Sequence, residues 1–321
     1  MRAAVCPAYG PPEVVRVEEY PVPPIQPDHV GVRVEAAAVN FPDVLLIANS
    51  YQVSIPPPFV PGSEFAGTVD EVGSEAAGFA IGDRVTGTGM FGAFAERVVV
   101  AASAVTRIPD GVDVPTAAAF GVAYRTAYHT LRSMARLDSG AELVVLGAGG
   151  GVGLAAVQLG VALGAKVTAV ASSPEKLDVA ASYGATGLIN HRTQDLRAAL
   201  RRALPEGADV VIDPVGGELA EPALRALRRG GRFVTVGYAS GVIPRIPLNL
   251  VLVKGIQVLG FQFQDVPDAE FERNEAELQE LLVSRRVQPH VCAVYLLSET
   301  AAALRHVADG RAIGKVLIDL S

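Results

Sequence analysis

The stretch that decides the fold is LVVLGAGGGVGLAAVQLGVALGAKVTAVASS, which occupies residues 143–173. It opens on an apolar run typical of a buried strand, passes through a glycine-rich turn and continues as an alanine-rich helical segment. A second run of β-formers, KVTAVAS, closes the stretch. This order predicts a βαβ unit with two parallel strands.

The same alternation continues along the chain. Strand-like runs recur at GLIN (187–190), ADVVIDPVG (208–216) and RFVTVGY (232–238). Helical segments of roughly 10–15 residues separate them, which favours a parallel sheet covered by helices on both faces. We therefore predict an α/β fold containing a doubly wound Rossmann domain.

The first hundred residues have a different pattern. Segments such as HVGVRVEAAAV (29–39) and EFAGTVDEV (64–72) are rich in β-formers and are bounded by Pro and Gly, which predicts a β-rich, partly closed domain. One long helix over 115–137 is expected to lead into the Rossmann domain. After about residue 263 the chain is expected to return to the first domain, because a lone helix and short strands make a poor third domain.

Composition excludes several classes of function. The 321 residues carry a formal net charge of −7, which gives no basis for binding a nucleic-acid backbone. No apolar run approaches the roughly 20 residues of a spanning helix, so we expect no membrane partner and a cytoplasmic location. Two Cys and five His cannot supply a disulfide framework or an all-cysteine zinc site.

The glycine-rich turn has the spacing of a dinucleotide site. It fits A-x-G-x-x-G as Ala148, Gly150 and Gly153. The first N–H groups of the following helix would face a pyrophosphate; the alternative is a simple strand-to-helix connection. The candidate pyrophosphate-binding residues are Gly147, Gly150, Gly151, Val152 and Gly153.

The end of the second strand bears on which dinucleotide binds. An NAD site usually places Asp or Glu there, but this chain has Ser172, Ser173 and, slightly later, Lys176. Hydroxyl and ammonium groups suit a 2′-phosphate, so we predict NADPH rather than NADH. The alternative is that the two serines only cap the helix beginning at Pro174.

Motifs spread over nearly the whole chain carry a family resemblance. They include VNFPDVLL (39–46), PFVPGSEFAGTVDEVG (58–73), YRTAYHTL (124–131) and GRAIGKVLI (310–318). With them the sequence resembles the medium-chain dehydrogenase/reductase superfamily, and within it the zinc-independent quinone oxidoreductases related to zeta-crystallin. The resemblance implies a GroES-like substrate domain over 1–118 and 263–321, a Rossmann NADP-binding domain over 119–262, and a substrate cleft where the two meet.

A departure from the zinc alcohol dehydrogenases of this superfamily bears on the chemistry. Their G-H-E motif matches Gly62, Ser63 and Glu64 here, and no Cys lies between Asp83 and Arg107. A catalytic zinc needs about three protein ligands, and the usual imidazole and thiolate groups are missing. We expect no metal, and therefore an acceptor such as a quinone or an activated enone that needs only hydride and hydrogen bonds.

The resemblance also supplies candidate catalytic residues: Asn40, Asp43, Tyr51 and Thr126. An amide can donate a hydrogen bond to a substrate oxygen and a phenol can donate or relay a proton, and Thr126 matches a residue near the nicotinamide. Structural alternatives are a turn at Asn40, a helix cap at Asp43, packing at Tyr51 and an ordinary helix position at Thr126. Residues 45–49 (LLIAN) differ from relatives that have an aromatic residue and a cation there, which predicts a more apolar pocket.

Further cofactor positions are implied by the resemblance alone. They are His191, Gly216, Gly217, Gly237, Tyr238, Phe261, Gln262 and Phe263. The remaining histidines, His129 among them, are expected to be solvated or ordinary helix residues. The run IQVLG (256–260) matches the edge strand through which family members pair, so a homodimer is expected.

Together these observations predict a zinc-free oxidoreductase that passes hydride from NADPH to a quinone or another conjugated carbonyl. An enoyl-thioester reductase is the alternative enzyme, because synthase enoyl reductase domains share the VNFPDVLL and glycine-turn motifs. An NADPH-binding structural or sensor protein is the alternative without catalysis.

Overall fold

The computed structural model describes residues 1–321 and divides into two compact units. The first unit consists of Met1–Val122 and Gln288–Ser321, and the second of Ala123–Val287. The second unit is thus one continuous segment between two segments of the first.

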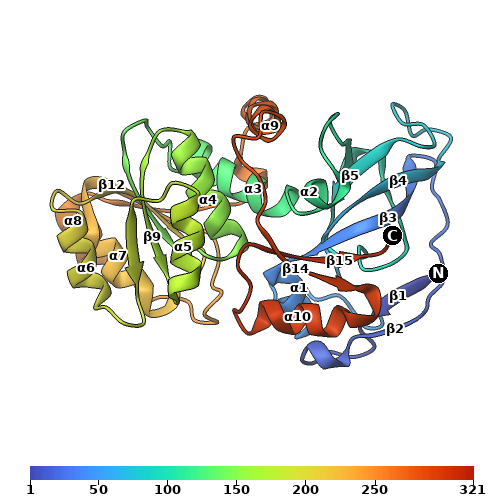
Figure 1. Ribbon diagram of the computed structural model, residues 1–321, viewed down its shortest axis with the longest axis horizontal. Coiled ribbons are helices and arrows are strands. Elements are labelled where there is room, and N and C mark those ends of the chain that lie inside the picture. The colour runs from blue at the N-terminus through green and yellow to red at the C-terminus, as the bar shows by residue number, and fades with distance from the viewer. The chain divides into compact units, whose positions relative to one another are not determined.

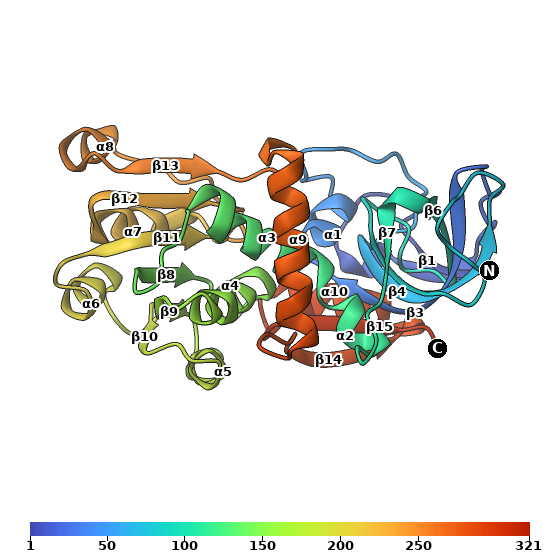
Figure 2. The same ribbon diagram turned by 90° about the horizontal axis from the view of Figure 1, so that it is seen from above.

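A six-stranded parallel sheet forms the second unit. Its strand order is β10-β9-β8-β11-β12-β13, which Figure 2 shows from β10 to β13. The strands are β8 (Glu142–Leu146), β9 (Lys166–Ala171), β10 (Gly187–Asn190), β11 (Ala208–Asp213), β12 (Leu227–Thr235) and β13 (Gln257–Gly260). The helices are α3 (Gly121–His129), α4 (Gly151–Ala162), α5 (Pro174–Ser182), α6 (Leu196–Ala203), α7 (Ala220–Ala226), α8 (Leu248–Lys254) and α9 (Asp268–Val283).

Helices cover both faces of this sheet. In Figure 1, α6, α7 and α8 lie on one side and α4 and α5 on the other. All of β8 from Leu143 to Leu146 is therefore fully buried, although the side chains alternate between the faces. Val144 and Leu146 belong to the core that includes Leu200 of α6 and Leu224 of α7. This architecture confirms the predicted doubly wound Rossmann domain.

The strand order reverses direction between β8 and β11. In open parallel sheets, ligands bind beyond the carboxyl ends of the strands at such a switch point. Two turns flank it here: the glycine-rich turn 147–150 after β8 and the turn 214–217 after β11. The fold thus places the predicted dinucleotide motif at the position that binds ligands.

The first unit is β-rich. Its seven-stranded sheet has the order β14-β15-β3-β4-β5-β7, with β6 also paired to β3, and β1 and β2 form a separate antiparallel pair. The strands are β1 (Arg2–Val5), β2 (Arg16–Glu19), β3 (His29–Val39), β4 (Glu64–Val72), β5 (Arg84–Thr88), β6 (Arg97–Ala101), β7 (Val105–Arg107), β14 (Val291–Leu296) and β15 (Lys315–Asp319). Three helices accompany them: α1 (Phe41–Ile47), α2 (Val114–Ala118) and α10 (Thr300–Ala308).

The single helix expected over 115–137 was wrong, because the segment breaks between α2 and α3 and ends in a π-helical turn, Thr130–Met134. The break coincides with an approach of Glu64, whose Oε1 accepts the Val122 N–H at 2.8 Å. A Cβ atom on Gly121 would lie 3.1 Å from the same oxygen. A carboxylate from β4 therefore accepts a backbone N–H from the first turn of α3.

The helix α9 belongs to the second unit, whereas the sequence assigned residues from 263 onward to the first domain. Its buried face packs on α3 and on the π-helical turn that follows it: Tyr128 of α3 donates to Glu277 at 2.6 Å, and Asn274 Nδ2 donates to Ser133 Oγ of the turn at 3.0 Å. None of the helices combines the length and apolar character needed to cross a bilayer.

Candidate functional site

The glycine-rich turn of the second unit is shaped by close backbone contacts. Gly147 has a φ of +61°, and a Cβ atom there would lie 2.6 Å from Val215 Cγ2. A Cβ atom on Gly153 would lie 2.0 Å from the Gly147 carbonyl oxygen, so only glycine lets α4 pack on the turn. At Gly150, by contrast, the nearest atom would be 3.5 Å away, which leaves room beside the backbone.

The start of α4 follows directly. Gly150 is the N-cap residue, and Gly151, Val152 and Gly153 are the first helical residues. Their N–H groups have no acceptor within the helix, and they coincide with its positive dipole end. The open cradle at Gly150 and these N–H donors fit the pyrophosphate of a nicotinamide dinucleotide.

Cationic side chains gather beyond the ends of β9 and β10. Burial lowers the pKa of His191, and the positive charges of Arg192 and Lys176 lower it further. The stem of Lys176 lies over the turn, since a Cβ atom on Gly149 would lie 2.6 Å from it. Arg192 was not among the predicted residues; its position beside His191 was the available signal.

Ser172 and Ser173 differ in their positions relative to the start of α5. Ser173 is the N-cap of α5, and its Oγ accepts the Lys176 N–H at 3.4 Å. A hydrogen bond from Ser173 also lowers the pKa of Glu175. The capping role considered for Ser173 is therefore present. Ser172 lies between β9 and this cap and is half-buried.

The remaining predicted cofactor positions lie in two other places. Gly216, Gly217, Gly237 and Tyr238 belong to interlocked turns after β11 and β12. Phe261 is buried and Phe263 is 40% exposed, and their ring centroids lie 4.9 Å apart. Gln262 between them is exposed.

A buried histidine contacts these two aromatic rings. His129 is fully buried and stacks on Phe271 at 4.7 Å and on Phe261 at 6.4 Å between ring centroids. Its Nε2 lies 2.9 Å from Glu275 Oε1. His129 is a helix residue, as one of the two expected alternatives had it, but it is buried rather than solvated. Its three aromatic neighbours come from segments more than 130 positions later, which no local pattern connects.

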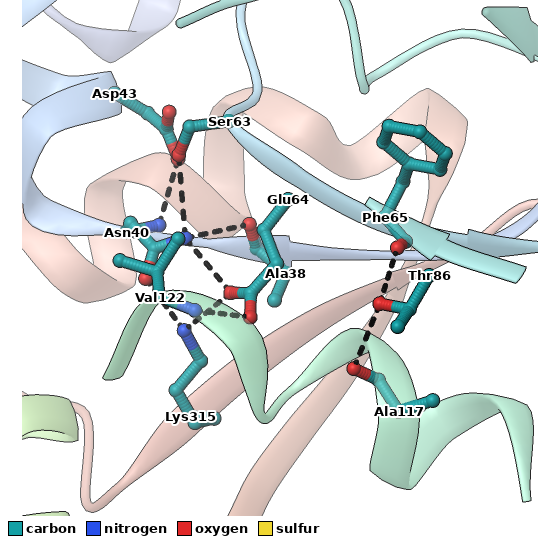
Figure 3. A network of polar contacts seen from close by, with 10 residues as sticks. All are labelled: Ala38, Asn40, Asp43, Ser63, Glu64, Phe65, Thr86, Ala117, Val122 and Lys315. Atoms are coloured by element: carbon teal, nitrogen blue, oxygen red, sulfur yellow. Dashed lines mark hydrogen bonds and ion pairs between the residues drawn. The ribbon is translucent and has the colours of Figure 1, made fainter. Parts of the chain in front are cut away.

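The first unit contains a buried polar cluster, drawn in Figure 3, of Asn40, Asp43, Ser63, Glu64 and Lys315. Lys315 Nζ donates to Asn40 Oδ1 at 2.5 Å and to Glu64 Oε2 at 3.0 Å. Asn40 Nδ2 donates to the same Glu64 oxygen at 3.1 Å. The cluster thus pairs one carboxylate with one ammonium group and joins them through an amide.

Asn40 and Asp43 also form a reciprocal cap at the start of α1. The Asn40 backbone N–H donates to Asp43 Oδ2 at 2.7 Å, whereas Asp43 Oδ1 is buried without a hydrogen-bond partner. Burial raises the pKa of Asp43 to about 7, against the opposing effects of the Asn40 N–H, the Ser63 hydroxyl and Lys315. The helix begins earlier than the cap considered for Asp43 requires: Asn40 is the N-cap of α1, and Asp43 is its third helical residue.

These residues do not fit a catalytic zinc. The position of the G-H-E histidine holds Ser63, and the neighbouring carboxylate of Glu64 is already paired with an ammonium group 3.0 Å away. Bringing a divalent cation to Glu64 would set it against the Lys315 charge without the soft or imidazole donors that zinc prefers.

Tyr51 and Thr126, the other predicted catalytic residues, lie in different units. Tyr51 is half-buried against the core of the first unit. Thr126 is a half-buried residue of α3 in the second unit. Sequence reasoning did not assign a role to Glu64 or Lys315, which organise the polar cluster.

Comparison with known proteins adds to this geometry. The family described as "Alcohol dehydrogenase GroES-like domain" matches residues 26–110, and "Zinc-binding dehydrogenase" matches residues 151–280. The first match confirms the GroES-like character expected of the first unit.

Individual relatives match nearly end to end. "Quinone oxidoreductase-like protein 2" of Bos taurus is 36% identical over 99% of this chain and 92% of its own length. The Escherichia coli quinone oxidoreductase structure in complex with NADPH has a TM-score of 0.92 at 27% identity, covering 99% of this chain and 100% of the other. A polyketide synthase of Streptomyces halstedii is 34% identical over 92% of this chain but only 5% of its own length.

Proposed function

Because the chain belongs to the quinone oxidoreductase family of medium-chain dehydrogenases/reductases and is an oxidoreductase of that type, we propose that it transfers hydride from NADPH to a quinone or another conjugated carbonyl, without zinc. The observation that supports a reaction without zinc is the buried ion pair of Lys315 and Glu64, because Glu64 matches the glutamate of the G-H-E motif of zinc alcohol dehydrogenases. Without a metal to polarise it, a simple ketone is a poor acceptor, whereas a conjugated carbonyl accepts hydride readily.

The second unit would hold the cofactor. When bound, NADPH supplies hydride from its nicotinamide ring. The N–H groups of Gly151, Val152 and Gly153 would donate to its pyrophosphate, with Gly147 and Gly150 allowing the backbone to approach. The E. coli relative in complex with NADPH, named above, supports this assignment.

Preference for NADPH over NADH would come from the cationic group beyond β9 and β10. Lys176 and Arg192 bring positive charge to a region that lacks the carboxylate typical of an NAD site, and His191 lies beside them with a lowered pKa. The Ser172 hydroxyl would add a hydrogen bond to the 2′-phosphate, and Ser173 would keep α5 capped. The remaining predicted positions would line the nicotinamide end: Gly216, Gly217, Gly237, Tyr238, Phe261, Gln262 and Phe263.

The roles proposed for residues near the acceptor depend on which polar side chains already have hydrogen-bond partners. Both amide hydrogens of Asn40 face partners within the cluster, so Asn40 and Asp43 would position α1 rather than touch substrate. The Tyr51 phenol is the group proposed to donate a hydrogen bond to the acceptor oxygen, and Thr126 is proposed to lie near the nicotinamide. Leu46 and Ile47 are buried in the core of the first unit, so of the three aliphatic residues the half-buried Leu45 would give the pocket an apolar character.

An NADPH-oxidation screen across quinones, enals and enoyl-CoA thioesters tests this function. We expect quinones or enals to be the best acceptors and saturated ketones to be inactive. The polyketide synthase relative favours a second candidate, an enoyl-thioester reductase. Faster oxidation with crotonyl-CoA than with any quinone would select that candidate.

We also propose that the protein is a homodimer formed through β13. This strand is the outer edge of the second unit's sheet, so one side of its backbone can pair with a second copy. The adjoining helix α8 exposes Leu248 (76%), Leu252 (83%) and Val253 (63%). A second copy would cover these apolar side chains as it extends the sheet.

A further inference from the structure

Asp213 is a fully buried acid at the carboxyl end of β11, beside the switch point of the sheet. Its Oδ1 accepts the N–H of Val215 at 2.9 Å and of Gly216 at 2.8 Å. Its Oδ2 is buried without a partner. All the hydrogen bonding of this carboxyl group therefore serves the turn 214–217.

That turn is tied to the loop 236–242 after β12. The carbonyl oxygens of Pro214 and Val215 accept the N–H groups of Ala239 at 3.1 Å and Ser240 at 2.9 Å, and Gly217 donates to the Val242 carbonyl at 2.9 Å. A Cβ atom on Gly216 would lie 2.8 Å from Tyr238 Cδ1. The two segments therefore nest more closely than side-chain-bearing residues would allow.

The same turn also contacts the glycine-rich turn on its other side. Val215 Cγ2 would lie 2.6 Å from a Cβ atom on Gly147. A shift of the backbone that Asp213 holds would thus change two surfaces at once, the start of the pyrophosphate turn and the Tyr238 loop. Displacements of about 1 Å at such positions can cost on the order of 100-fold in function.

We propose that Asp213 is the positioning residue of the dinucleotide crevice: its carboxyl group holds the turn 214–217, and the turn sets the spacing between the glycine-rich turn and the loop 236–242. This inference rests on the proposed NADPH site. Asp213 itself is not proposed to contact the cofactor. We expect the affinity for NADPH to depend on Asp213 more than the affinity for the acceptor does. Burial raises the pKa of Asp213, in keeping with a carboxyl group that has few donors around it.

The test compares Asp213→Ala with Asp213→Asn by titrating each folded protein with NADPH. Asp213→Ala removes the acceptor, and we expect the Kd for NADPH to rise about tenfold or more while the KM for the acceptor changes less than about threefold. Asp213→Asn keeps an oxygen facing the two N–H groups, and its Kd should stay within about threefold of wild type.

Asp195→Ala is the matched control, because Asp195 Oδ1 accepts one backbone N–H, from Ala198 at 2.7 Å, at the start of α6 in the same unit. It should lower stability without changing the Kd for NADPH. If Asp213→Ala fails to fold, Asp213→Ser replaces it: its hydroxyl oxygen lies one bond short of the position of Oδ1, so the N–H groups of Val215 and Gly216 lose their acceptor, and the Kd should again rise.

Three results would overturn the proposal. They are folded Asp213→Ala that binds NADPH like wild type, Asp213→Asn that binds as weakly as Asp213→Ala, and, in the substitute experiment, Asp213→Ser with an unchanged Kd. Wild-type protein that does not bind NADPH would instead overturn the proposed function, and this inference with it.

Discussion

Asp43 experiences two opposing influences. Its carboxyl group is fully buried, which disfavours the charged form, while the Asn40 N–H, the Ser63 hydroxyl and the Lys315 charge favour it. Burial is the larger effect and raises the pKa to about 7 from an ordinary value of 3.8. The folded protein therefore retains a proton over a pH range in which the unfolded chain releases it.

This retention predicts a pH-dependent stability. The contribution of Asp43 to the free energy of unfolding is fully present below about pH 4 and is lost as pH rises to about 7, by at most about 1.4 kcal/mol per pH unit. Denaturant unfolding of wild type and Asp43→Asn from pH 4.5 to 8 measures it. The stability of wild type relative to the variant should fall up to about pH 7 and then level off. A difference independent of pH would show that Asp43 is ionised throughout.

Lys176 carries the prediction about cofactor choice. Lys176→Ala should raise the KM for NADPH about tenfold and leave that for NADH nearly unchanged, because only NADPH has a 2′-phosphate. The control is Lys166→Ala, a 68% exposed lysine at the opposite end of β9 that pairs with Glu142 at 3.3 Å. Equal effects of Lys176→Ala on both cofactors would contradict the phosphate assignment.

At single residues, sequence reasoning succeeded where the chemistry is local. The spacing of Gly147, Gly150 and Gly153 placed the turn correctly because a strand and its following helix are adjacent in the chain. It missed Lys315, because its partner Glu64 lies 251 positions away. Asn40 was identified as a polar candidate, but nothing in the sequence indicates that its amide hydrogens are donated to partners within the cluster.

At the scale of elements, periodicity predicted most of the Rossmann unit. Buried strands such as β8 are apolar after their first residue, Glu142, and the helices between them are long enough to show their apolar face. The break between α2 and α3 was missed because it depends on Glu64 from β4 reaching the Val122 N–H. A local pattern of helix-forming residues contains no sign of such a contact.

The exposed edge formed by β13 and α8 carries a prediction about assembly. Leu252→Glu should convert a dimer to a monomer, because it places a charge within the apolar surface that a second copy would cover. Leu188→Glu is the control on β10, the opposite edge strand of the same sheet, where Leu188 is 40% exposed. Light scattering during size-exclusion chromatography gives the molecular mass, which distinguishes a dimer from a monomer. A monomeric wild type at micromolar concentration would refute the dimer.

At the scale of the whole molecule, the two units contain different kinds of polar group. The β-rich first unit contains a buried cluster in which the Lys315 ammonium group pairs with the Glu64 carboxylate. The second unit supplies the open cradle at Gly150 and the helix start beyond it. The assignment of α9 was missed because its contacts with the second unit, such as that between Glu277 and Tyr128, join residues 149 positions apart.

The central claim is metal-free reduction of a conjugated carbonyl by NADPH. The most direct measurement is the rate of NADPH oxidation with a quinone acceptor, before and after treatment of the protein with a strong zinc chelator. We predict equal rates in both samples, since Lys315 rather than a metal ion is paired with Glu64. A rate that disappears with the chelator and returns when zinc is added would contradict the account.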